Sequence, residues 1–218
     1  MDNRKLQKML VMLGIAGGLL AFALLLVSLL LGGSQEPFQV VRSVSEYSQM
    51  LAARSMAMRL SFTLDNIFIV VYTAFFVLLG ILLKEHGNPT MINLAAGAII
   101  ITGLLDAIEN SHIITMMTQV EKGLPINESE LALQMIASQV KFISSYISIF
   151  VMGLCFPRTT WLEKFAAASF VYLLLPLGVL TLTAPREWIP ALVVTRGVFF
   201  IFGFLLTSKV FWDRSNQI

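Results

Sequence analysis

The sequence predicts an all-α integral membrane protein, a polytopic bundle of six transmembrane helices, and three observations support this. The first is composition, since 57% of the residues are hydrophobic and 13% are charged, whereas soluble domains carry about 25% charged residues. The second is a set of apolar stretches long enough to cross a hydrocarbon core of about 30 Å. The third is the Gly- and Pro-containing turn signals between those stretches. Together they exclude a water-soluble globule.

Each predicted span has close to the 20 residues that 30 Å requires at about 1.5 Å per residue. The spans are Leu10 to Leu31, Leu60 to Leu83, Met91 to Met116, Leu131 to Phe156, Phe165 to Leu182 and Ile189 to Val210. The first span is longer than the core of a secretory signal peptide, which is about 7 to 15 residues, so we expect an uncleaved helix. No composition shift marks a second folded unit, so residues 1–218 are expected to form a single membrane domain.

Short motifs mark several helix ends and contacts. Gly14 and Gly18 are spaced as G-x-x-x-G, which permits close approach of another helix, although Gly is also simply common in membrane helices. Asn127 matches either a glycosylation acceptor or a helix cap that opens the fourth span, and we favour the cap. Turn residues separate other spans at Gly87-Asn88-Pro89, Pro157 and Pro185.

The connection between the first two spans has a different character, because the segment from Gln35 to Met58 is too polar to cross a membrane. From Ser43 onward, Val44, Tyr47 and Leu51 recur near helical spacing. This pattern predicts either an amphipathic interfacial helix leading into the second span or a plain surface linker.

The distribution of Lys and Arg in the loops predicts the orientation of the bundle, since cytoplasmic loops carry an excess of these residues. With the N-terminus in the cytoplasm, that side holds eight of them: Arg4, Lys5, Lys8, Lys84, Arg158, Lys164, Lys209 and Arg214. The other side holds five: Arg42, Arg54, Arg59, Lys122 and Arg186. We therefore expect both the N- and the C-terminus in the cytoplasm.

Apart from Lys209, which lies at the very end of the last span and is counted with the loops, five charged residues fall inside the predicted spans: Asp65, Asp106, Glu109, Lys141 and Arg196. A charge near the bilayer centre costs about 2.5 to 3.5 kcal/mol on the lower estimates, so these side chains are expected to face the bundle interior. On the six-span topology all five lie roughly 7 to 15 Å below the outer boundary. We expect one buried polar network in the outer half, with Lys141 paired to Asp106 or Glu109.

Polar neighbours share helix faces with these charges. Asn110 lies one turn after Asp106, and Ser138 and Ser145 flank Lys141 in a polar stripe along the fourth span.

The charge balance of this predicted network also needs an explanation, because the network contains three carboxylates and only two cations. Either Arg59, at the outer end of the second span, supplies a third cation, or one carboxylate holds a proton. His112, one turn beyond Glu109, is a candidate proton relay or a hydrogen-bonded residue near the helix end.

These features predict that the charged cluster binds or passes a small polar solute, ion or lipid headgroup. One alternative is a structural or accessory subunit of a larger membrane complex, whose ion pairs fix helix register. Another is an intramembrane enzyme that uses Asp106 and Glu109 as acid and base, or as metal ligands with Asp65. No nucleophile–base pattern or two-His motif supports the enzyme, so enzymatic activity stays uncertain and neither metal nor cofactor is assigned.

Other partners and cofactors are limited by the same composition. The net charge of +2 is scattered without a basic tract, which argues against nucleic acid. His86 and His112 fall at opposite ends of the third span and are not expected to share a haem. The expected partners are the lipid bilayer and either further copies of this chain or other subunits of a membrane complex.

Overall fold

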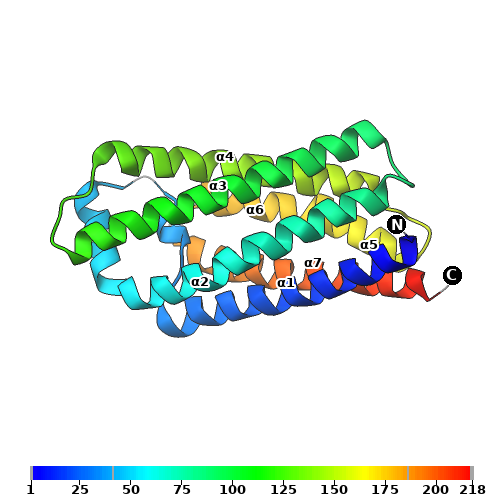
Figure 1. Ribbon diagram of the computed structural model, residues 1–218, viewed down its shortest axis with the longest axis horizontal. Coiled ribbons are helices and arrows are strands. Elements are labelled where there is room, and N and C mark those ends of the chain that lie inside the picture. Colours follow the sequence, from blue (N-terminus) through cyan, green and yellow to red (C-terminus); the bar gives the residue numbers. More distant parts are fainter. Residues whose placement is uncertain (1, 41, 186, 217–218) are drawn as a thin grey trace.

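The computed structural model describes residues 2–40, 42–185 and 187–216, and all regular elements in this part of the chain are helical (Figure 1). Arg186, counted above among the outer-loop cations, lies outside the described residues. The elements are α1 (Asn3–Leu31), η1 (Glu36–Phe38), α2 (Val44–Leu83), α3 (Pro89–Glu121), α4 (Glu128–Cys155), α5 (Trp161–Ala168), η2 (Ser169–Leu174), α6 (Leu175–Thr183) and α7 (Ile189–Ser215). Six helical stretches are long and apolar enough to cross a membrane. The predicted all-α architecture with six helices long and apolar enough to span a membrane is therefore confirmed.

Both chain termini lie at one end of the bundle, which we call the terminal end (Figure 1). There, Asn3 Nδ2 donates to Glu85 Oε1 at 2.5 Å. Arg214 Nε lies 2.7 Å from Glu163 Oε1, and Arg214 Nη1 lies 2.8 Å from His86 Nε2. Residues 32–40, after α1, and residues 122–127, between α3 and α4, lie at the opposite end, which we call the loop end.

Helix α2 is longer than the predicted second span, because its 40 residues begin at Val44 and include most of the polar segment before that span. Ser43 and Glu46 form a capping box that satisfies backbone N–H groups at the start of the helix. Figure 1 shows the first turns of α2 crossing the loop end of the bundle. Tyr47 and Leu51, on these turns, are fully buried.

The fifth membrane-spanning stretch is not a regular α-helix. It consists of α5, the π-helical η2 and α6, in that order. Pro176, in the first turn of α6, has no backbone N–H to donate, and its ring would clash with the carbonyl four residues earlier in an α-helix. A wider π-helical turn directly before the proline accommodates this disruption.

Buried apolar side chains form two separate clusters. The cluster nearer the terminal end includes Phe75, Leu79, Ile92, Met152 and Phe211. The cluster at the loop end includes Phe38, Tyr47, Met58, Met116 and Leu131. Along α2, α3 and α4 the predicted charged residues come between members of the two clusters, so a polar layer divides the core.

Helices α1 and α7 pack closely where α1 carries glycine. A Cβ on Gly17 would lie 2.9 Å from the ring of Phe204, and a Cβ on Gly14 would lie 3.1 Å from the Phe204 carbonyl oxygen. Gly18 of α1 faces Leu205 and the backbone of Ile201, which both belong to α7. The spacing of Gly14 and Gly18 therefore does permit a close helix contact, and this contact holds Phe204 toward the bundle interior.

Candidate functional site

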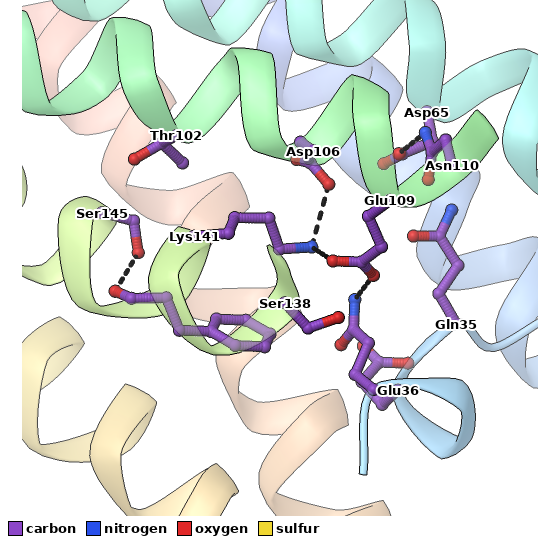
Figure 2. A network of polar contacts seen from close by, with 12 residues as sticks. Gln35, Glu36, Asp65, Thr102, Asp106, Glu109, Asn110, Ser138, Lys141 and Ser145 are labelled. Atoms are coloured by element: carbon purple, nitrogen blue, oxygen red, sulfur yellow. Dashed lines mark hydrogen bonds and ion pairs between the residues drawn. The ribbon is translucent and has the colours of Figure 1, made fainter. Parts of the chain in front are cut away.

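Lys141 of α4 lies at the centre of the buried charges (Figure 2). Its Nζ is 2.9 Å from Asp106 Oδ1 and 2.8 Å from Glu109 Oε2. Asp106 and Glu109 reach the same ammonium because they are three residues apart on one face of α3. Lys141 is 6% exposed and Glu109 is fully buried, so salt screens these pairs little. The ion pair expected for Lys141 is present, and it involves both of the expected partners.

Asp65 of α2 is buried beside this triad, yet it pairs with no Lys or Arg in the described part of the chain. Asn110 Nδ2 donates to Asp65 Oδ2 at 2.7 Å and lies 3.2 Å from Asn66 Oδ1. The predicted neighbour Asn110 therefore positions Asp65. An amide supplies a hydrogen bond but no positive charge, so the Asp65 carboxylate lacks a counter-ion among the described residues.

Tyr72 and Thr102 extend the network toward the terminal end. The Tyr72 hydroxyl donates to Asp106 Oδ2 at 3.0 Å, so both oxygens of Asp106 have partners. The Thr102 and Ser144 hydroxyls lie 2.8 Å apart and link α3 to α4. The sequence reasoning did not include Tyr72 in the site, although its position seven residues after Asp65 places both on one face of α2.

A segment before α2, which we call the plug (residues 33–40), closes the loop end of the network. Gln39 Nε2 donates to Glu109 Oε1 at 2.7 Å, and Gln134 Nε2 donates to the Phe38 carbonyl at 3.0 Å. Phe38 is fully buried, with its ring 5.3 Å from that of Tyr47. The sequence reasoning treated this segment as linker and missed Gln39. A Phe within a polar connection is the signal that could have indicated burial.

Arg196 of α7 was expected to join the network of charged span residues, and its ion-pair partner lies outside the spans. Arg196 pairs with no carboxylate of the spans among the described residues; its Nη2 lies 2.9 Å from Oε1 of Glu36, in the plug. Arg196 still belongs to the polar layer, because its guanidinium carbon lies 5.7 Å from the centroid of the Phe142 ring. Lys141 Nζ lies 4.9 Å from the same centroid. The expectation of one network made from span residues alone therefore needs correction: the plug supplies the counter-ion of Arg196.

Arg59 and His112 lie at the edge of the bundle rather than within the polar layer. Arg59 Nη2 pairs with Glu121 Oε2 at 2.6 Å, with both side chains partly exposed. His112 Nδ1 lies 3.4 Å from Glu130 Oε1. In this arrangement Arg59 does not supply a third cation to the layer, and His112 contacts a residue at the start of α4 rather than Glu109.

The two predicted serines of α4 have unlike environments. Ser138 is fully buried, and its Oγ accepts from Gln134 Nε2 at 3.0 Å. Ser145 Oγ donates to the Phe142 carbonyl at 2.8 Å, and Ser145 lines a cavity beside Lys141.

This cavity has a volume of roughly 230 Å³ and lies between α1, α2, α3, α4, α7 and the plug. Part of its wall is charged, with Glu36, Asp65, Asp106, Lys141 and Arg196. Another part is apolar, with Phe68, Phe76, Ile99, Ile149, Phe200 and Phe204. An engineered apolar cavity of about 150 Å³ is large enough to hold benzene. The space in this bundle is therefore sufficient for a small organic molecule.

One face of α2 contributes to both parts of the wall. Ser61, Asp65, Phe68, Tyr72 and Phe76 all line the cavity, and their spacing of three or four residues places them along a single helical stripe. Asp65 lies nearer the loop end of this stripe, and the aromatic residues follow toward the terminal end.

The charged side chains of this site are arranged chiefly as ion pairs. In the described part of the chain, no group of three or more His, Cys, Asp and Glu side chains is placed to hold a metal ion. Asp106 and Glu109 both contact Lys141, which fits an ion-paired cluster better than a separate acid and base. Comparison of the chain with protein-family models, curated proteins and solved structures found no match.

Proposed function

We propose that this membrane protein binds a small molecule with a polar head and an apolar body in the cavity between α1, α2, α3, α4 and α7. The observation that carries the proposal is the wall of this cavity, which joins charged side chains to aromatic ones. A ligand that fills the apolar part of the cavity gains packing contacts with its aromatic side chains. The polar head of the ligand contacts the charged part, where buried charge is otherwise costly.

We further propose that the terminal end faces the cytoplasm. The terminal end carries Arg4, Lys5, Lys8, Lys84, Arg158, Lys164, Lys209 and Arg214, and this excess supports the orientation. The charged part of the cavity and the plug then lie toward the outer compartment, so a polar solute from that side meets the plug first.

The first turns of α2 are proposed to lie in the membrane interface. A helix of 40 residues is roughly 60 Å long, twice the hydrocarbon thickness. Its N-terminal turns cross the loop end of the bundle (Figure 1), which supports a position at the headgroup level.

A second candidate function is that of an accessory subunit in a larger membrane complex. Helix α7 favours it, because 17% of its most apolar stretch is buried inside the bundle, whereas 50% of the most apolar stretch of α2 is buried. The uncovered face of α7 is available to lipid or to a partner helix. The same helix face could instead contact a further copy of this chain in a homo-oligomer. Co-purification of a stoichiometric partner in mild detergent would support the accessory role.

Native mass spectrometry of the protein released from its own membranes tests the binding function. Gly197 lines the cavity, and a Cβ there would meet Leu25 at an ordinary 3.4 Å. Gly197→Leu should therefore reduce the cavity without a backbone clash. Gly97→Leu is the matched control, since a Cβ at Gly97 meets no atom within 4 Å.

We expect a non-lipid adduct of defined mass on the wild type and on Gly97→Leu, and its loss from Gly197→Leu. Equal adducts on both variants, or none on a folded wild type, would contradict the proposal.

A further inference from the structure

We infer that the molecule bound in the cavity is an organic amine, whose ammonium group pairs with Asp65 and whose apolar body packs against the aromatic wall. This inference rests on the proposed binding function and adds the chemical class of the ligand. Three properties of the cavity carry it: its balance of charge, the aromatic face of α2, and its size.

The charge balance favours a cation. Lys141 already contacts Asp106 and Glu109, and Arg196 already contacts Glu36. An anionic ligand would have to displace one of these carboxylates from its buried cation.

Asp65, in contrast, is 8% exposed, lines the cavity and has no cationic partner among the described residues. Figure 2 shows Lys141 directed to Asp106 and Glu109, while Asp65 contacts Asn110. A buried carboxylate without a counter-ion is costly, and a ligand ammonium supplies the missing charge.

The aromatic wall favours an organic cation over an inorganic one. Phe68 lies one turn from Asp65, and its ring centroid is 5.3 Å from that of Tyr72 and 5.8 Å from that of Phe204. Phe76 continues this surface, with its ring centroid 6.0 Å from that of Phe204. Aromatic faces attract ammonium groups and also pack against apolar groups. A bare metal cation has no apolar body, so it would leave the apolar part of this wall without packing contacts.

The size of the cavity restricts the ligand further. If about 150 Å³ holds the six carbons of benzene, then 230 Å³ corresponds to about nine or ten non-hydrogen atoms by the same proportion. The chains of a two-chain phospholipid would have to lie outside this volume. The phosphate of such a lipid would also add a negative charge beside Glu36 and Asp65, so a free amine fits better than a lipid headgroup with the same ammonium group.

Isothermal titration calorimetry of the protein in nanodiscs tests the inference with probes of one skeleton. The probes are 3-phenylpropylamine, 3-phenylpropan-1-ol and 3-phenylpropionate, and glycerophosphoethanolamine represents a lipid headgroup. Empty nanodiscs correct for partitioning into lipid. We expect the amine to bind at least about tenfold more tightly than the alcohol, which corresponds to a modest charge pair, and the carboxylate to bind more weakly than either.

The variant Asp65→Asn separates charge from shape, because asparagine keeps the size of the side chain and an oxygen for Asn110. It should lose the preference for the amine while still binding the alcohol. Asp213→Asn removes the same charge at the terminal end, where Asp213 pairs with Lys209, and should keep the preference. The comparison of probes on the wild type remains decisive even if Asp65→Asn does not fold.

The two proposals fail in different ways. Alcohol or carboxylate binding as tight as amine binding, or tighter binding of glycerophosphoethanolamine, would overturn the amine inference and leave the binding function standing. Binding of none of the probes would also overturn it, and the adduct seen by native mass spectrometry would then decide the binding function separately.

Discussion

Replacement of Lys141 by methionine should destabilise the bundle strongly. The substitution keeps a long unbranched side chain but removes the ammonium that lies 2.9 Å from Asp106 and 2.8 Å from Glu109. Both carboxylates then remain in the polar layer with Asp65 and without their cation. Removing one partner of a buried ion pair costs about 3–5 kcal/mol, a large fraction of the roughly 5–15 kcal/mol of a typical native protein.

Reversible unfolding in bicelles by a denaturing detergent, followed by circular dichroism, measures this loss. Lys209→Met is the matched control, since it removes the same group from a pair whose side chains are 60% and 41% exposed. An exposed pair contributes about 0 to 1 kcal/mol, so the control should unfold almost as the wild type does.

The double variant Lys141→Met/Glu109→Gln should recover part of the stability, because it removes one of the two carboxylates left without a cation. If Lys141→Met unfolds like Lys209→Met, or if adding Glu109→Gln makes the protein still less stable, the assignment of Lys141 as the buried counter-ion is refuted.

Three further outcomes are expected. Gly17→Leu should lower stability by about 1–3 kcal/mol, because its side chain would collide with Phe204; unfolding curves check this. Gln39→Ala leaves an oxygen of buried Glu109 without its donor, at a cost of about 1–3 kcal/mol, and hydrogen exchange in the plug should accelerate. Thr160→Cys, in a background without other cysteines, should react with a membrane-impermeant thiol reagent only from the side that holds the N-terminus; reaction only from the other side would contradict the six-span topology.

The membrane architecture could be predicted from sequence because its physical causes are local. A run of about 20 apolar residues is needed to cross the bilayer, and charges within such runs must face inward. The pairing of Lys141 with Asp106 and Glu109 followed from their similar depth on consecutive helices. The π-helical η2 was not predicted, although Pro176 is a local signal of a disturbed helix.

The plug and the partner of Arg196 could not be predicted in the same way. Gln39 is 70 positions from Glu109 in the chain, and Glu36 is 160 positions from Arg196. Depth along a helix places Arg196 in the polar layer but does not say which side of the bundle it faces. A polar connection gives no periodic signal of burial, so its return into the bundle depends on tertiary packing around Phe38.

The central claim, that the cavity receives a small amine, is tested most directly by protection of a cysteine placed in its wall. Ser145→Cys is introduced together with Cys155→Ser, and its reaction with a small thiol reagent is followed with and without 3-phenylpropylamine. Lys122→Cys, at the exposed loop end, serves as the control. The account predicts that the amine slows the reaction at position 145 in proportion to its occupancy and leaves position 122 unchanged; an unchanged rate at position 145 under saturating amine would contradict it.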